Sequence, residues 1–452
     1  MKFLRFGICL LVAFSVIALG AVDVWSESIF ELGTAALFVL WGFLVVSKQV
    51  ADIRWNPLNW PLLGLLVIGL AQLGLHRTVY PYLTKVDLLK LTAAFLIFFL
   101  TAQAFRERRD FVAFVWFIVS FGFVVALFGI AQHFSSNGKI YWVLPVPEGG
   151  TFFGPYVNVN HFAGFVELTA PLGLALLAFR GLRRDLVPMT GLLTVVPIAA
   201  LILTGSRGGI LSFLFEIGFL ALLVCNLRAR KARAGAFAIV VLAAGTLIAW
   251  LGAGKAMERF AQLRPEEVTL ARRWSMFKGS ARIFLSHPIA GTGLGTLVVV
   301  YPKYETMYDG RLVDHSHNDY IEMLADLGIL GGVCSFAFLY LLFRSAFRQF
   351  ACEQGHFSLA FHTGALAACA GILLHSFVDF NLHIPANLTL FLLQSYLAAS
   401  PCLDSEGPPA SRHSSSVTSS TPRYGHWIFF LIFSSIVPLN KPLQPSFEER
   451  FA

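Results

Sequence analysis

The sequence predicts an all-α integral membrane protein with about 12 transmembrane helices and a large extracytoplasmic loop before the tenth. Three observations lead to this class. Of the 452 residues, 56% are hydrophobic and only 13% are charged, whereas soluble domains carry about 25% charged residues. The mean hydropathy is +0.69. Apolar runs of about 20 residues, the length that crosses a bilayer, recur along the chain as far as residue 400.

The expected spans follow one another with mostly short connections. We place them at 3–22, 29–47, 57–75, 91–105, 111–132, 162–179, 187–204, 209–226, 235–253, 318–343, 360–379 and 384–400. The first run could be a cleaved signal peptide, but the many apolar segments after it favour a transmembrane helix. Residues 1–400 therefore form one membrane domain. Residues 401–452 form a Ser- and Pro-rich tail that we expect to be disordered, and its apolar segment 427–439 is short for a span.

Lys and Arg residues set the orientation of these spans. With the N-terminus inside, every inside segment carries at least two of these residues, and the short outside segments carry far fewer. Cytoplasmic loops are enriched in Lys and Arg, so the net charge of +8 reflects topology and does not predict nucleic-acid binding. Two long loops, 133–161 and 254–317, then lie outside. The six cysteines show neither CxxC nor metal-ligand spacing, and none falls in an outside loop, so no disulfide framework is expected.

The outer loops hold the side chains that suit chemistry. Arg207 lies at the tip of the short turn LTGSRGGILSF, where its planar fork could bind a phosphate or simply cap a helix at the membrane edge. In the longer loop, Trp274, Phe277, Ala281 and Phe284 recur at helical spacing. This spacing predicts an amphipathic helix on the membrane surface, or a solvated lid. GTGLGT (291–296) lacks the strand and the third glycine of a dinucleotide site and is expected to form a tight turn.

Ionisable residues are densest in DHSHNDYIEMLADLGILGG, 314–332. Ser316 is expected to cap the helix that follows. His317 shares a helical stripe with the small residues Gly328 and Gly331, which would allow close packing. The acidic residues Asp319, Glu322 and Asp326 form a second stripe without an evident role. Two histidines and an aspartate fall short of a metal site, so we expect no metal and no cofactor.

Two further outer segments carry polar side chains. In HSFVDFNLHIPANLTL, 375–390, His375 and Asp379 are one helical turn apart and are expected to touch. His383 and Asn387 flank a proline and favour a hydrogen-bonded clamp between helices. In GTFFGPYVNVNHFAGF, 150–165, Asn158, Asn160 or His161 could cap the sixth span.

With these motifs in order, residues 150–400 resemble the O-antigen ligase family, which includes related bacterial polysaccharide polymerases. TGSRGG resembles its arginine turn, and ARRWSMFKGSARIFLSHPIAGTGLG resembles its large periplasmic loop, with Phe277 where the family often has Trp. His317-Asn318 followed by Gly328 and Gly331 fits the spacing His-Asn-x9-Gly-x-x-Gly, and FVDFNLHIPAN resembles its late helix.

The resemblance implies a multi-pass glycosyltransferase of the GT-C class in the bacterial inner membrane, with its active site facing the periplasm. The implied donor is a glycan on undecaprenyl diphosphate, and the implied acceptor is lipid A core, another lipid-linked glycan or, as in related oligosaccharyltransferases, a protein hydroxyl. Other polysaccharide assembly proteins could be partners.

A cationic group must stabilise the diphosphate that leaves, so we expect Arg207 and Arg273 to clamp it. His317 would orient or deprotonate the acceptor hydroxyl, and the transfer would be metal-independent and inverting. We expect further substrate contacts from a set of neighbouring residues: Arg272, His315, Asn318, Asp379 and His161. Asp314, His315 and Asp319 are weaker candidates for holding His317 in one tautomer.

Three alternatives remain. The sequence leaves ligase and polymerase open, because both need an outer site for lipid diphosphates. A solute transporter, for example of bicarbonate, should place polar residues near the bilayer midplane and often shows inverted repeats. Here the polar residues collect at the outer edge and no repeat is visible, so transport ranks below transfer. A non-catalytic assembly subunit is the third alternative.

Overall fold

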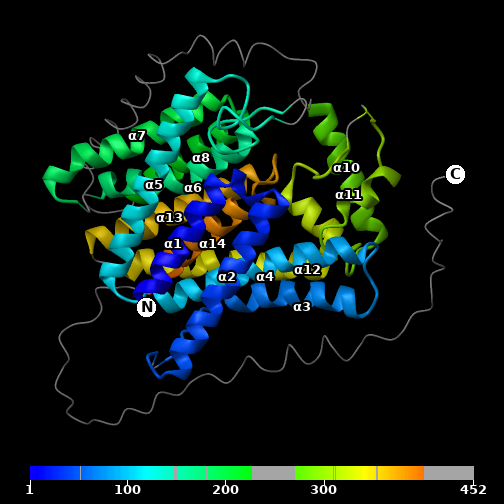
Figure 1. The fold of residues 1–452 in the computed structure, drawn as a ribbon, viewed down its shortest axis with the longest axis horizontal. Coiled ribbons are helices and arrows are strands. Elements are labelled where there is room, and N and C mark those ends of the chain that lie inside the picture. The colour runs from blue at the N-terminus through cyan, green and yellow to red at the C-terminus, as the bar shows by residue number, and fades with distance from the viewer. Residues whose placement is uncertain are drawn as a thin grey trace. The chain divides into compact units, whose positions relative to one another are not determined.

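The structure is a computed structural model that describes residues 1–50, 52–146, 150–179, 182–225, 270–308, 310, 312–352 and 355–401. These residues form helices and no strand (Figure 1). The predicted span 235–253, the beginning of the long outer loop and the tail with its segment 427–439 lie outside the described residues.

The other eleven predicted spans are each a helix in the described part of the chain. The long helices are α1 (Lys2–Ile17), α2 (Val24–Val46), α3 (Asn59–Gly74), α4 (Pro81–Ala104), α5 (Arg108–Ser135), α6 (Val159–Ala178), α7 (Val187–Thr204), α8 (Arg207–Cys225), α12 (Asp319–Cys352), α13 (His356–His375) and α14 (Pro385–Ala399). Among the described residues, 7 helices are long and apolar enough to cross a membrane. The all-α membrane class is therefore confirmed, while the count of twelve spans and the GT-C likeness stay predictions.

The long outer loop and the turn before α14 add shorter elements. They are α10 (Leu270–Ser286), α11 (Leu297–Val300) and the 3-10 turns η3 (Tyr301–Lys303) and η4 (Asn381–His383). Two more 3-10 turns, η1 (Leu19–Ala21) and η2 (Arg184–Leu186), lie next to α1 and α7. Figure 1 shows α10 and α11 together beside one end of α12.

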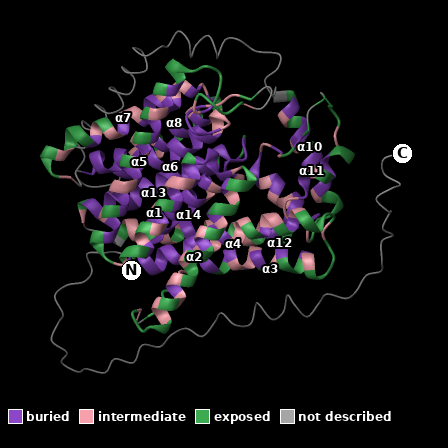
Figure 2. Ribbon diagram, viewed as in Figure 1, coloured by how far each residue is buried: buried purple, intermediate pink, exposed green. Residues whose placement is uncertain are grey.

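The centre of the bundle is built from α6 and α13, which pack closely against each other (Figure 1). Both are buried along almost their whole length, as Figure 2 shows. Their close approach depends on a small residue, since a Cβ at Gly364 would lie 2.9 Å from the Cα of Leu172. Small residues at helix contacts are the usual means of tight packing in membranes. Nearer the outer ends, the imidazole of His375 in α13 bonds to Glu167 in α6, so these ends also lie side by side.

The turn 291–296 joins the outer loop to α12 and α3. Gly291, Gly293 and Gly295 all have positive φ, so the predicted tight turn is confirmed. The backbone N–H of Gly295 donates to Oδ2 of Asp326 at 2.7 Å. The side chain of Gln72 in α3 donates to the carbonyl oxygens of Ala290 and Asp326, at 2.6 and 2.8 Å.

The same turn explains a kink in α12. Gly328 has φ 63° and ψ −162° inside the helix, a region that is essentially restricted to glycine. A Cβ there would lie 2.3 Å from the carbonyl oxygen of Ile289. The prediction that His317, Gly328 and Gly331 share one continuous helical stripe is therefore wrong, because the outer loop packs against the backbone of α12 at this point.

The predicted amphipathic helix is α10, but its aromatic stripe points away from the protein. Met276 and Ile283 are buried, whereas the side chain of Trp274 is 56% exposed and stacks on Phe277 with ring centroids 5.3 Å apart. Lys278 lies over the Trp274 ring at 5.2 Å. Exposed Trp and Lys side chains are typical of a helix at a membrane interface, so the membrane-surface alternative remains the prediction for α10.

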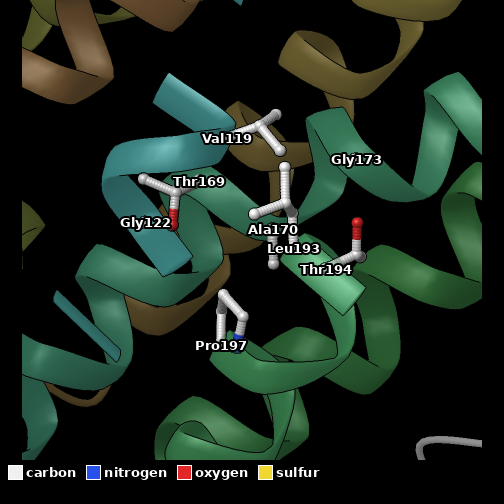
Figure 3. Close-up of a pocket in the computed structure, with 8 residues that line it drawn as sticks. All are labelled: Val119, Gly122, Thr169, Ala170, Gly173, Leu193, Thr194 and Pro197. Atoms are coloured by element: carbon white, nitrogen blue, oxygen red, sulfur yellow. The ribbon is translucent and has the colours of Figure 1, made fainter. Parts of the chain in front are cut away.

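A small cavity between α5, α6 and α7 contains no ionisable side chain (Figure 3). It has no room for a water molecule. The hydroxyls of Thr169 and Thr194 on its wall donate to carbonyl oxygens of their own helices. We therefore treat it as a packing gap and look for function at the outer ends of the helices.

Candidate functional site at the outer helix ends

The start of α12 is hydrogen-bonded to the turn that follows α13. The side-chain oxygen of Asn318 accepts hydrogen bonds from the backbone N–H groups of Tyr320 and Ile321, both at 3.1 Å, and its amide donates to the carbonyl oxygen of Phe377. Asn318 therefore caps α12, and the prediction that Ser316 does so is wrong. Ser316 instead donates to the carbonyl oxygen of Asn318. Because both ends of the Asn318 amide bind the protein, its substrate-binding role stays a prediction.

His317 adopts a strained backbone next to this cap. Its φ is 51°, which is uncommon for a residue with a Cβ. Such conformations persist only where the surroundings hold them, and they are frequent at functional sites. Here the neighbouring Asn318 cap holds the backbone, and the imidazole points to the turn after α13.

Asp379, in that turn, is the centre of a buried polar cluster. Its Oδ2 accepts a hydrogen bond from the side chain of Asn160 at 2.5 Å, and its Oδ1 lies 3.3 Å from Nδ1 of His317 and 3.8 Å from Nε2 of His161. The two histidine contacts have ion-pair distance without hydrogen-bond geometry. Burial alone would raise the pKa of Asp379, but His161 and His317 hold that pKa well below the ordinary value of 3.8. Asp379 is therefore ionised at neutral pH.

Arg273 of α10 reaches the same turn from the outer side. Its Nη1 donates to the carbonyl oxygen of Val378 at 2.8 Å, and its Nη2 lies 3.9 Å from Oδ2 of Asp379. The side chain is still 30% exposed, so part of the guanidinium faces away from the protein. Arg272, the other predicted substrate contact on α10, is buried. Burial raises the pKa of the Tyr301 hydroxyl, and the nearby Arg272 lowers it.

Arg207 is the exposed first residue of α8, and Ser206, the residue before it, is linked to Asp379 through Asn160. Ser206 accepts from the backbone N–H of Gly209 at 3.2 Å and donates to the side-chain oxygen of Asn160 at 2.8 Å. Asn160 in turn donates to Asp379. The start of a helix favours anions, because its first N–H groups have no partner within the helix. Arg207 thus adds a cation to a position that already suits a phosphate.

The glycines of TGSRGG are needed because this turn rests on α6 and α13. A Cβ at Gly208 would lie 2.9 Å from Nε2 of His375, and one at Gly209 would lie 2.5 Å from the Cβ of Ala163. The motif therefore combines an exposed arginine with a backbone that must approach its neighbours closely.

A second polar cluster joins the start of α12 to η4. Nδ1 of His315 and Oε1 of Glu322 are 2.6 Å apart, as are Nδ1 of His383 and Oδ1 of Asp319. Nε2 of His383 also lies 3.4 Å from Oε1 of Glu322. These contacts give the acidic stripe, whose role the sequence left open, two histidine partners. They also occupy His315 and Asp319, two of the three weaker candidates for orienting His317. The third, Asp314, is exposed and accepts from the backbone N–H of His315.

The ring of Phe380 separates the two clusters. It stacks on His315 with ring centroids 4.2 Å apart, and it meets His317 and His161 edge-on at 5.0 and 4.7 Å. His317 and Asp379 lie with Arg273 in the first cluster, whereas His315 belongs to the second.

His315, Glu322 and His383 have ligand atoms within 4.8 Å of one another, so a metal ion could bind there. A tetrahedral zinc ion with bonds of about 2.0–2.1 Å would hold its ligands about 3.3 Å apart. The contact of 2.6 Å between His315 and Glu322 is a direct hydrogen bond and is shorter than that. We therefore interpret the cluster as hydrogen-bonded ion pairs.

We predict that His383 makes stability pH-dependent. Burial would lower its pKa, but Glu322, Asp319 and the more distant Asp87 raise it from 6.5 to about 10. Since the folded state favours protonated His383, this contribution is complete below pH 6.5 and is lost as the pH rises to about 10. The thermal stability of the purified protein should therefore fall between pH 7 and 10 by more than that of a His383→Gln variant. Intrinsic fluorescence during heating measures this, with the exposed His287→Gln as the control. Equal slopes for all three proteins would contradict it.

Two buried carboxylates inside the bundle were missed by the sequence analysis. Glu167 of α6 accepts from Nδ1 of His375 at 2.8 Å, and Glu216 of α8 packs against Gly371 of α13. Neither oxygen of Glu216 has a hydrogen-bond partner in the described part of the chain. The predicted contact of His375 with Asp379 is made through the backbone, where the N–H of Asp379 donates to the carbonyl oxygen of His375 at 3.1 Å, while the imidazole pairs with Glu167. The expectation that polar residues collect at the outer edge is wrong. A lone Glu in an apolar run was the available signal, because ionisable residues within spans are functional candidates.

The clamp predicted at Asn387 is present. Its amide donates to the carbonyl oxygen of His161 at 2.9 Å and to the side chain of Asn381 at 3.0 Å, and its oxygen accepts from the hydroxyl of Tyr156. Asn158 accepts from the backbone N–H of Asn160 and caps α6. These bonds hold His161 beside Asp379.

Four outer segments thus meet at one place: the starts of α6, α8 and α12, and the turn after α13. Comparison with known families agrees with the resemblance seen in the motifs. Residues 192–336 match the O-antigen ligase family model. The match is narrower than the predicted 150–400, but it includes Arg207, Arg273 and His317 with the glycines after it. No curated protein matches the chain.

The O-antigen ligase match and the apolar helices together indicate a multi-pass membrane protein of polysaccharide biosynthesis. Glycan transfer is the activity that this family implies. Asp379, His161 and the second cluster with His383 lie outside or partly outside the matched segment. Only the structure connects them with the arginines and His317.

Proposed function

We propose that the protein transfers a glycan from undecaprenyl diphosphate to an acceptor hydroxyl on the periplasmic face of the inner membrane. The observation that carries this proposal is the cluster of Arg273, His317 and His161 around the ionised Asp379. All four outer segments that meet there are ones that the Lys and Arg distribution assigns to the outside. An O-antigen ligase and a surface polysaccharide polymerase both perform this reaction.

The arginines suit the leaving group. When the acceptor oxygen bonds to the anomeric carbon, the bond from that carbon to the diphosphate oxygen breaks and the electron pair leaves with the diphosphate. Arg273 is anchored by Val378 and Asp379 with part of its guanidinium facing outward. Arg207 stands at the start of a helix. Two planar cations can bind the oxygens of a diphosphate bidentately, so the transfer needs no metal ion.

His317 suits the acceptor. Its Nδ1 faces the Asp379 carboxylate, which leaves Nε2 as the nitrogen that accepts the hydroxyl proton. A carboxylate behind an imidazole fixes the tautomer and stabilises the imidazolium that forms. One direct displacement by this hydroxyl inverts the anomeric centre.

Replacing Arg207 by Lys tests the clamp, because Lys keeps the charge but loses the fork. We expect transfer by the purified protein, with lipid-linked donor and glycan acceptor, to fall about 10²-fold or more, as for other transition-state donors. The exposed Arg282→Lys of α10 is the matched control and should transfer normally. The assay contains EDTA throughout, so full wild-type activity supports the metal-independent reaction. Near-normal transfer by Arg207→Lys would exclude the clamp.

Ligase and polymerase differ in what a deletion strain accumulates. Mass spectrometry of lipid-linked and mature glycans separates them: free lipid-linked polymer indicates a ligase, and single repeats alone indicate a polymerase.

Solute transport is the second candidate, and the buried Glu167, Glu216 and His375 are the observation that favours it. Chains of Asp, Glu and His within spans are typical of proton-coupled transporters. Uptake of bicarbonate by the purified protein in liposomes, lost in Glu216→Gln, would favour transport over transfer.

A further inference from the structure

A cavity of about 280 Å³ lies beside the second polar cluster, whose His315, Asp319 and His383 line it. Its walls come from α2, α3, α4, α12, α13 and α14, and most of the side chains that line it are apolar, including Phe30, Leu62, Phe338 and Leu388. His315, which stacks on Phe380, lines the cavity, so its polar end adjoins the proposed transfer site. Cavities of this size, with apolar walls and a few convergent polar groups, are typical binding sites.

The polar end of the cavity is acidic. It is lined by five carboxylates, one lysine and two histidines: Glu27, Glu31, Asp87, Asp319, Asp326, Lys90, His315 and His383. Lys90 pairs with Glu27 at 3.3 Å and with Asp87 at 3.0 Å. His383 pairs with Asp319. The carboxyl groups outnumber the cations along this wall, and neither Glu31 nor Asp326 takes part in an ion pair within the described part of the chain.

Asp326 has an unused acceptor at the cavity wall. Its side chain is almost fully buried, with 3% exposure. Oδ2 accepts from the backbone N–H of Gly295, whereas Oδ1 has no hydrogen-bond partner among the described residues. A buried carboxylate oxygen without a donor is costly. A ligand with hydroxyl groups would supply that donor.

The transfer site and this cavity therefore suit different substrates. A diphosphate is attracted to Arg207 and Arg273 and is repelled by a wall with more carboxylates than cations. Carboxylate oxygens accept hydrogen bonds from sugar hydroxyls, and the apolar walls suit a lipid chain. We propose that this cavity binds the acceptor, a hydroxyl-rich saccharide without phosphate on the bound sugar, carried on a lipid anchor, with Asp326 and Glu31 accepting hydrogen bonds from its hydroxyls. The acceptor role rests on the proposed glycan transfer.

The test uses the full chain in nanodiscs and a dodecyl maltoside whose alkyl chain carries a photoreactive diazirine. We expect labelled peptides from α2, α4 and α12, and no competition from a tenfold excess of undecaprenyl diphosphate. Asp326→Asn keeps the size of the side chain but changes the oxygens that can accept a hydrogen bond, so the probe should bind about tenfold more weakly, the loss expected for one buried hydrogen bond. Asp23→Asn, an exposed residue just before α2, is the matched control and should bind normally.

Competition by undecaprenyl diphosphate, together with normal labelling of Asp326→Asn, would overturn the proposal and assign the cavity to the donor lipid. Labelling that is equal in wild type, Asp326→Asn and Glu31→Gln would also overturn it, because binding would then need no carboxylate. Glu31 is only half-buried, so its variant keeps the test valid if Asp326→Asn does not fold. Saccharide binding that depends on Asp326 in a protein without any transfer would overturn the proposed function and leave the saccharide site in place.

Discussion

Replacing His317 by Gln is expected to lower the rate of glycan transfer by about 10²- to 10⁴-fold, the contribution that a positioned base makes. The physical reason is that the imidazole lies between the Asp379 carboxylate and the outer face of the helix bundle. Gln offers an amide of similar reach that cannot take a proton. The amount of bound donor should change little, since the diphosphate contacts come from the arginines. Initial rates with purified protein and a fluorescent lipid-linked donor measure the loss.

Two further measurements distinguish a catalytic base at position 317 from a residue that only holds the fold. His287→Gln removes an exposed imidazole from the same outer loop and should transfer at the normal rate. Imidazole added to a His317→Ala variant should restore part of the activity, which it would not do if the side chain only held the fold. A His317→Gln rate within threefold of wild type would remove His317 from the mechanism.

The membrane class and the positions of the helices could be predicted because each depends on local sequence. An apolar run of sufficient length must be helical in a bilayer, since its backbone groups have no other partners there. Each described span accordingly lies within about five residues of its predicted place, apart from two. α4 begins at Pro81, ten residues before the predicted start, and α12 ends at Cys352, nine residues after the predicted end. The turns at 205–209 and 291–296 could be predicted because glycine is the residue that allows a positive φ and a close approach of the backbone to neighbouring atoms.

The partners in the site could not be predicted in the same way. Helical spacing shows which residues share a face, but it does not show what that face meets. His375 and Asp379 have the spacing of a contact, yet His375 bonds to Glu167, 208 residues away in the chain. Asp319 finds its partner in His383, 64 residues away. Asn160 was readable as a helix cap, whereas its bonds to Ser206 and Asp379 depend on how α6, α8 and α13 pack.

Glu167 and Glu216 illustrate a different limit. Each is the single acidic residue in an apolar run, so the mean hydropathy of the span does not reveal it. Their burial among α6, α8 and α13 appears only when the three helices are placed together. The sequence could have marked them as unusual, but it could not have shown that they lie behind the turn that carries Arg207.

Asp379→Asn should lower transfer about 10²-fold or more, because it removes the one charge that faces His317, His161 and Arg273 together. The analogous loss of an orienting carboxylate behind a catalytic histidine is of this size or larger. Asp314→Asn is the matched control: Asp314 is exposed and accepts from the backbone N–H of His315, so its loss should leave the rate unchanged. Since the pKa of Asp379 is held well below 3.8, the wild-type rate should show no loss from its protonation above about pH 4.

A double variant decides how Asp379 acts. If the carboxylate works by orienting His317, then Asp379→Asn combined with His317→Gln should be no slower than His317→Gln alone, because residues that act as one unit are strongly non-additive. If it works instead by holding Arg273 for the diphosphate, the two losses should multiply. The geometry favours the first outcome, since Arg273 keeps its hydrogen bond to the Val378 carbonyl without Asp379, whereas the carboxylate at 3.3 Å is the charge that faces Nδ1 of His317.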